Sequence, residues 1–267
     1  MSCLKERFRM IDKKPVEFIQ HVLSTIILDA VQFFPQNKKK IHSEAHGLIF
    51  GMNKEKSVEC DYAFPIGSVQ ERNNVSVLPD TKVDQAVKSA KELFSTSNCI
   101  GTYHSHPYDE PFDEWADPSN ADCGAAEYLN LPYFFIIAIA RNGQKNQPLS
   151  LHYGESEAYE FSYNPNANGH DDPKIQPVND QVSYIYGEFQ KYTFTIRAYK
   201  NTGKSLIDVD LVSSEAELMM ILNEENIKLE DISLQETYRL RKLEYNLRVE
   251  NKEKGQKNLN YHLEKMK

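Results

Sequence analysis

The chain contains 267 residues, of which 40% are hydrophobic and 26% are charged, and its formal net charge is −8. This length fits one large domain or one domain with an appendage, and the composition is ordinary for a soluble globular protein. The negative charge gives no general attraction to nucleic acid or to anionic membranes, and the most apolar runs, at residues 25–28 and 131–140, are too short to span a bilayer.

The N-terminus and the cysteines indicate a cytoplasmic protein. Residues 1–14 lack the apolar centre of a signal peptide. Cys3, Cys60, Cys99 and Cys123 show no paired spacing such as Cys-x-x-Cys, so we expect reduced and mostly buried thiols. Cys123 follows a candidate metal ligand, which leaves a ligand or nucleophile role open, but a small core residue is the favoured interpretation.

Apolar patterns predict alternating strands and helices in the first third of the chain. Residues 8–11 fit a first strand, and residues 16–22 fit either a second strand or a lead into a helix. Ser24 is a candidate N-cap for a helix over residues 25–34, which Pro35 ends.

The pattern continues with strands and one amphipathic helix. Residues 48–51 and 58–65 predict adjacent strands, and residues 75–78 predict a further one. Apolar residues at helical spacing predict a helix over residues 84–94.

Two histidines then follow an apolar run at residues 99–103. His104 and His106 are two residues apart, and on a strand such side chains point to one face, where two imidazoles can share a metal ion. A His-x-His pair by itself is more often structural, so this interpretation depends on a further ligand nearby.

The helix that follows offers this ligand. Asp117 reads as its N-cap and Pro118 as its first residue, with the helix running over residues 118–129. Ser119 and Asp122 are three apart and share one helix face. The Asp122 carboxylate can join the two imidazoles, and three protein ligands with an open fourth position are typical of catalytic zinc sites. The alternative is that Ser-x-x-Asp is only a capping box.

Glu44 lies just ahead of the predicted strand at residues 48–51. A hydrolytic metal site needs a base that takes a proton from water and later delivers it to the leaving group, and a carboxylate outside the metal shell suits this role. Alone, Glu44 is a surface charge. His42 and His46 flank it, and we interpret both as structural or as support for the ligands.

Together, Glu-x-x-Gly, His-Ser-His-Pro and Ser-x-x-Asp resemble the JAMM (MPN-plus) metalloprotease family, which includes deubiquitinating isopeptidases and bacterial relatives. The resemblance covers about the first 165 residues. It implies the MPN (JAB) fold and one zinc ion per chain, with Glu44 as the general base. The hydroxyl of Ser119 is expected to stabilise an oxyanion by about 3 kcal/mol. The matching positions are Glu44, His104, His106, Pro107, Ser119 and Asp122.

The resemblance also implies a substrate. It is a ubiquitin-like protein or its conjugates, cut after the C-terminal glycine at a peptide or isopeptide bond. Residues 108–118 form a loop longer than is usual in the family, and Phe112 and Trp115 within it are candidate substrate contacts beside four acidic residues. The alternative for this loop is a flexible, solvated segment.

The middle of the chain completes the first predicted domain, residues 1–165. Residues 133–140 (YFFIIAIA) are a continuous apolar run of strand length, as expected of a central strand covered on both faces. Residues 149–153 and 158–163 predict further strands. The fold class is therefore α/β, with a mixed β-sheet flanked by helices.

The remaining residues predict an appendage. Residues 166–183 are rich in Asn, Asp and Pro and read as a linker, and residues 184–232 read as a small ββα unit. Residues 233–267 predict a charged helix with two short apolar seams. A unit this small needs support, so we expect it to pack on the first domain or on a partner protein.

Two other functions stay open. One is a non-catalytic MPN scaffold that only binds partner proteins, although such relatives typically lack ligands that this chain retains. The other is a hydrolase of short peptides or small-molecule amides at the same site.

Overall fold

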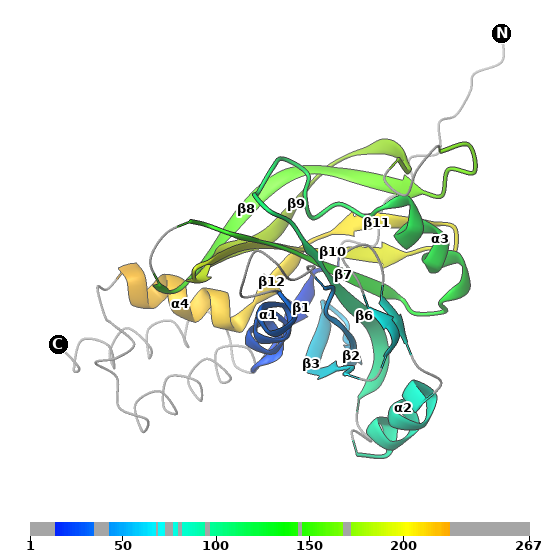
Figure 1. Ribbon diagram of the computed structural model, residues 1–267, viewed down its shortest axis with the longest axis horizontal. Coiled ribbons are helices and arrows are strands. Elements are labelled where there is room, and N and C mark those ends of the chain that lie inside the picture. Colours follow the sequence, from blue (N-terminus) through cyan, green and yellow to red (C-terminus); the bar gives the residue numbers. More distant parts are fainter. Residues whose placement is uncertain are drawn as a thin grey trace, which may run out of the picture.

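The computed structural model describes residues 14–34, 43–67, 69–72, 77–79, 82–93, 97–143, 146–167 and 172–224. In this part of the chain, a ten-stranded mixed sheet and a two-stranded ribbon combine with four helices (Figure 1). The elements are β1 (Val16–Phe18), α1 (Val22–Phe33), β2 (His46–Asn53), β3 (Val58–Pro65), β4 (Val69–Arg72), β5 (Val77–Pro79), α2 (Lys82–Leu93), β6 (Asn98–Pro107), α3 (Asn120–Tyr128), β7 (Tyr133–Arg141), β8 (Gln147–Ser162), β9 (Lys174–Gln190), β10 (Tyr192–Asn201), β11 (Ser205–Val209), β12 (Leu211–Ser213) and α4 (Ser214–Glu224).

The large sheet has the strand order β11-β8-β9-β10-β7-β6-β2-β3-β1-β12. β6 and β7 pair in parallel, as do β1 with β3 and β1 with β12, whereas the other pairs are antiparallel. β11 also pairs with β10, so β8, β9, β10 and β11 close on one another at one end. The α/β class with a mixed sheet is confirmed.

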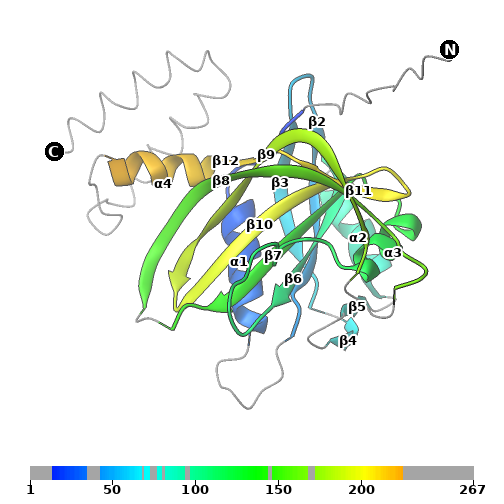
Figure 2. The same ribbon diagram turned by 90° about the horizontal axis from the view of Figure 1, so that it is seen from above.

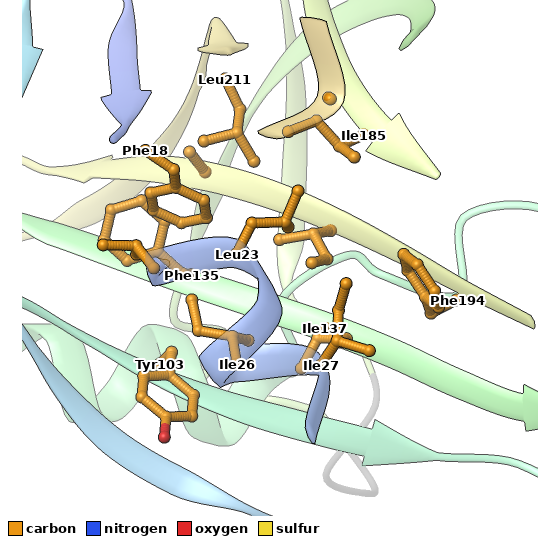
Figure 3. Packing of buried hydrophobic residues seen from close by; sticks show 14 of the residues in the cluster. Phe18, Leu23, Ile26, Ile27, Tyr103, Phe135, Ile137, Ile185, Phe194 and Leu211 are labelled. Carbon is orange, nitrogen blue, oxygen red and sulfur yellow. The ribbon is translucent and has the colours of Figure 1, made fainter. Parts of the chain in front are cut away.

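Helix α1 packs in the hollow of the curved sheet, as the view from above shows (Figure 2). The apolar face of α1 contributes Leu23, Ile26 and Ile27, which pack with Phe135 and Ile137 of β7 (Figure 3). All five side chains are at most 2% exposed, which makes this the main core of the protein.

The other face of β7 is covered as well. Phe134 and Ile136 pack with Cys123 of α3, and Ala138 packs with Trp115 of the preceding loop. Successive β7 residues therefore point alternately to the α1 layer and to the α3 layer. The continuous apolar run predicted such a doubly covered strand, and this prediction is confirmed.

The predicted domain division is wrong. β9 begins at Lys174, within the expected linker at 166–183, and pairs with β8. β10 pairs with β7 along nine residues, so the expected ββα unit at 184–232 contributes a strand to the centre of the same sheet. The reason is that alternating residues identify a strand but not its neighbour, and both faces of β10 are buried here. Phe194 and Ile196 join the α1 core, whereas Tyr199 joins the α3 layer.

Helix α1 begins at Val22, so Ser24 is not its N-cap. Glu215 of α4 caps it instead, because its carboxylate accepts hydrogen bonds from the Ser24 backbone N–H (3.0 Å) and the Ser24 hydroxyl (2.7 Å). This distant acceptor could not be found from local sequence.

Two other boundaries differ from expectation. The two strands predicted at 149–153 and 158–163 are one strand, β8, whose pairing shifts between Glu157 and Tyr159. α3 begins after Ser119 rather than at Pro118. The strand predicted at 8–11 and the helix predicted at 233–267 lie outside the described residues. Within the described part, none of the helices has the length and apolar content needed to cross a membrane.

Candidate metal centre

Strand β6 brings His104 and His106 to the α3 side of the sheet. β6 lies between β2 and β7, and both histidines are 8% exposed. Their Nε2 atoms lie 2.9 Å apart, as the i, i+2 spacing on a strand predicts. The two imidazoles therefore converge on one point.

Helix α3 supplies the third group through its first turn. Asp122 Oδ1 lies 3.0 Å from Nε2 of His104, and Asp122 Oδ2 lies 3.4 Å from Nε2 of His106. The three side chains that the sequence predicted as ligands thus meet in space, although they come from a strand and from a helix beyond an intervening loop.

Ser119 is the N-cap of α3 and forms a capping box with Asp122. The Ser119 backbone N–H (2.8 Å) and hydroxyl (2.7 Å) both donate to Asp122 Oδ2, while Ser119 Oγ accepts from the Asp122 N–H at 3.2 Å. The capping-box interpretation of Ser-x-x-Asp is therefore confirmed, and the same carboxylate also faces the two histidines. The cap fixes the orientation of the carboxylate that faces the histidines, as supporting hydrogen bonds do at metal sites.

The charges at this centre reinforce one another. Burial by itself lowers the pKa of His104, but the neighbouring Asp122 carboxylate and the charge of Glu44 raise it to about 9. Burial by itself raises the pKa of Asp122, but His104 and His106 hold it well below its usual value. Asp122 and the two imidazoles therefore form a buried, mutually stabilising charged group.

The donor set fits a small divalent metal ion. One ligand atom from each of His104, His106 and Asp122 lies within 4.8 Å of the others. Among the described residues, these three form the group of His, Cys, Asp or Glu side chains that could hold a metal ion. Two imidazole nitrogens and a carboxylate oxygen are ligands that zinc accepts, at about 2.0–2.2 Å from the ion. Nδ1 of His106 is buried with no hydrogen-bond partner among the described residues, so this ring makes its polar contacts through Nε2, which faces the centre.

Glu44 approaches the same centre from the segment before β2. His46 pairs with His104, and the Ser105 N–H donates to the Ala45 carbonyl just beyond the end of this pairing. Ala45 packs in the α1 core, so alternation directs Glu44 to the other face, where the histidines lie. Glu44 is only 6% exposed, and its charge raises the pKa of His104.

Gly47, the glycine of Glu-x-x-Gly, is required by a close approach. A Cβ atom on Gly47 would lie 2.2 to 2.5 Å from three atoms of the Tyr103 side chain. The hydroxyl of Tyr103 in turn donates to Asp29 of α1 at 2.8 Å. The glycine therefore lets β2 lie against Tyr103, which anchors β6 one residue before the first ligand.

The loop at residues 108–118 folds against the centre rather than away from it. The ring of Tyr108 meets His106 edge-on, with centroids 6.1 Å apart, and Phe112 packs on Tyr108 at 4.8 Å. Phe112 is 51% exposed, whereas Trp115 is 7% exposed and packs on Ala138. The ring of Trp115 is therefore part of the core, although a substrate contact was expected of it. Tyr108 was missed, although its place two residues after His106 is the signal for a shared face.

A buried ionic cluster, also missed, holds the end of this loop. Arg197 of β10 bonds Asp208 of β11 at 3.0 Å and lies 3.8 Å from Asp117, and the Tyr199 hydroxyl donates to the Ala116 carbonyl at 2.8 Å. Burial raises the pKa of Asp117 to about 7, even though Arg197 opposes this shift. One guanidinium serves two carboxylates, so a raised pKa at one of them is physically reasonable.

The other candidates near the centre are structural. Cys123 is fully buried among Ala126 and Phe134, and burial raises its pKa to about 12, so a core residue is the right interpretation. His46 Nε2 lies 2.9 Å from the Thr102 hydroxyl, which donates to the Gly47 carbonyl, so His46 belongs to the β2–β6 contact. His42 lies outside the described residues.

Comparisons with known proteins add little to this picture. No protein-family model and no curated protein matches the sequence. Among solved structures, the solution structure of protein DSY2949 from Desulfitobacterium hafniense is similar at a TM-score of 0.35 and 13% identity, covering 74% of this chain and 92% of that one.

Proposed function

We propose that this protein is a zinc-dependent amide hydrolase of the JAMM type with an MPN fold. The observation that carries the proposal is the meeting of His104, His106 and Asp122 at one buried point, with the buried Glu44 close enough for its charge to raise the pKa of His104. Three protein donors that leave a coordination position open are typical of catalytic zinc sites.

The chemistry divides between the ion and the chain. His104, His106 and Asp122 would hold a zinc ion, which would supply an acidified water and polarise a carbonyl. Glu44 takes a proton from the attacking water and returns it to the leaving amine. Because Glu44 is nearly buried and close to imidazoles, it is positioned to move protons without becoming a ligand.

Ser119 has a different role in this proposal from the one that the resemblance implies. Its hydroxyl proton is directed to Asp122 Oδ2, so stabilisation of an oxyanion requires that this bond be exchanged. Ser119 therefore acts first as a residue that orients a ligand.

The substrate proposed is a ubiquitin-like protein, or a conjugate of one, cut after its C-terminal glycine. The exposed part of the loop at residues 108–118 suits this role, because Phe112 presents a half-exposed ring beside the exposed residues Asp109 and Asp113. Substitution of Phe112 by Ala is expected to raise KM for a protein substrate several-fold and to leave kcat unchanged.

The test measures zinc per chain and hydrolysis of ubiquitin-like fusion proteins. The wild type is expected to hold about one zinc ion, and the double variant His104→Ala/His106→Ala to hold none and to lack activity. Glu44→Gln is expected to keep the zinc and to lose about 10²- to 10⁴-fold in kcat. No zinc in the reconstituted wild type refutes the proposal and favours a partner-binding scaffold. Zinc binding with cleavage of short peptides alone refutes the protein substrate.

A further inference from the structure

We infer that Ser105, the residue between the two histidines, is a positioning residue that fixes the general base Glu44. This inference rests on the proposed function. It concerns a side chain that touches neither a metal ligand nor a substrate. Because side chains alternate along β6, Ser105 points away from the face on which His104 and His106 lie. It is 0% exposed.

Ser105 holds the segment before β2 by two hydrogen bonds to one residue. Its backbone N–H donates to the carbonyl of Ala45 at 3.0 Å, and its hydroxyl accepts from the Ala45 N–H at 2.7 Å. In a regular antiparallel hydrogen-bonded pair, the second bond would run to the opposite backbone carbonyl. Here a side-chain oxygen replaces that carbonyl.

This replacement lies at the end of the ladder. The paired register between β2 and β6 ends at His46 and His104, and Ala45 is the next residue toward Glu44. The serine hydroxyl thus attaches the segment before β2 to β6 for one residue beyond the last ladder pair. Ala45 is held on its other side by packing in the α1 core, so the backbone that carries Glu44 is fixed from two directions.

The consequence for catalysis follows from geometry. A base must lie within hydrogen-bond reach of the proton that it takes, and a displacement of about 1 Å can lower a rate by about 100-fold. Loss of the Ser105 hydroxyl leaves a buried N–H at Ala45 without its acceptor, and the segment must move to satisfy it. The metal ligands, which lie on β6 and α3, keep their own supports.

The first experiment measures kcat, KM and zinc content of Ser105→Ala and of the nearly isosteric Ser105→Cys, which leaves no cavity. We expect kcat to fall by about 10- to 100-fold in both variants, with KM and zinc content close to wild type. The matched control is Ser205→Ala, which removes another buried serine hydroxyl, one on β11 that bonds Glu160 and Thr202. It is expected to keep the wild-type kcat.

The second experiment combines Ser105→Ala with Glu44→Gln. If Ser105 acts through Glu44, the double variant is no slower than Glu44→Gln alone, because the base is already missing. A purely structural serine slows both backgrounds by the same factor, and that result overturns the inference.

A third readout does not depend on activity. Hydrogen exchange of the peptide covering residues 43–48 is expected to be about tenfold faster in Ser105→Ala and Ser105→Cys than in wild type, with exchange in β7 unchanged. If the wild type shows no hydrolysis and the Ser105 variants still exchange faster than it, the proposed function is refuted, but Ser105 still holds the segment that carries Glu44. Unchanged exchange at residues 43–48 overturns the positioning role whatever the activity.

Discussion

The two faces of the β6–β7 pair differ in how they are held together. On the α1 face, side chains such as Tyr103, Phe135 and Ile137 belong to one large apolar cluster, in which each residue has many neighbours. On the α3 face, His104 and Asp122 are fixed by a few directed contacts near 3 Å. Residues of the same strands thus contribute to stability on one face and to chemistry on the other, because side chains alternate.

The difference predicts separable effects of substitution. An apolar contact is non-directional, so its loss lowers stability by an amount that depends on buried volume. A directed contact between polar groups is sensitive to angle and distance, so its loss changes the site more than the fold. Substitutions on each face therefore test whether the two faces are independent.

The largest effect is expected for Asp122→Ala, which removes a candidate ligand and half of a capping box. Zinc affinity is expected to fall by more than about 100-fold and hydrolysis to be lost. The free energy of unfolding is expected to fall by about 1 kcal/mol, because the Ser119 N–H loses its acceptor. Isothermal titration with zinc and urea denaturation of the metal-free protein measure the two quantities.

Asp122→Asn is the matched control, since its amide oxygen can still accept from Ser119. It is expected to lose zinc like Asp122→Ala but to keep most of the metal-free stability. Equal stability losses in the two variants would mean that the cap contributes nothing, and the α3 face would then be held by other contacts.

On the opposite face, Phe135→Ala is expected to lower the free energy of unfolding by about 3–5 kcal/mol, because the ring is fully buried against α1. Zinc affinity of the folded protein is expected to stay within a factor of about three of wild type. Chemical denaturation gives the stability, and zinc titration well below the unfolding transition gives the affinity. A large loss of affinity at full folding would show that the two faces are coupled through β7.

Asp117 offers a pH test of the α3 layer. Its pKa in the folded protein is raised to about 7, above that of an exposed aspartate, so the folded state holds the proton more tightly. This contribution to stability is fully present below about pH 4 and is lost as the pH rises through 7. Denaturation at pH 5 and pH 8 is expected to show a decline that Asp117→Asn reduces by about 1 kcal/mol or more. The exposed Asp113→Asn is the control that keeps the wild-type slope.

The same contrast explains what could be predicted from the sequence. Local periodicity identified β2, β3, β6 and β7, and the spacing of His104, His106 and Asp122 identified a site whose parts are each set by local geometry. The cap of α1 by Glu215 could not be predicted, because the partners are 191 residues apart in the chain. The pairing of β10 with β7 was not predicted for a similar reason, because alternation specifies a strand and not its neighbours.

Trp115 illustrates a second kind of failure. Its position in an acidic insertion suggested an exposed ring, but the small side chains of Ala138 and Ala140 on β7 leave room for it in the core. An aromatic residue in a polar segment is ambiguous until the surface opposite it is known. Phe112, three residues earlier in the same loop, packs on the ring of Tyr108 and stays half exposed.

The substitution most informative about mechanism is Ser119→Ala. If the hydroxyl mainly orients Asp122, zinc affinity is expected to fall by about 10- to 100-fold, while kcat at saturating zinc stays within a few-fold of wild type. If the hydroxyl stabilises an oxyanion, kcat is expected to fall by about 10²- to 10³-fold with zinc affinity unchanged. Stability is expected to fall by about 1 kcal/mol in either case, because Ser119 is the N-cap of α3. Ser119→Thr, which keeps both the hydroxyl and the cap, is expected to restore zinc affinity. The ratio of the two losses therefore shows whether this serine belongs to the framework of the metal centre or to its chemistry.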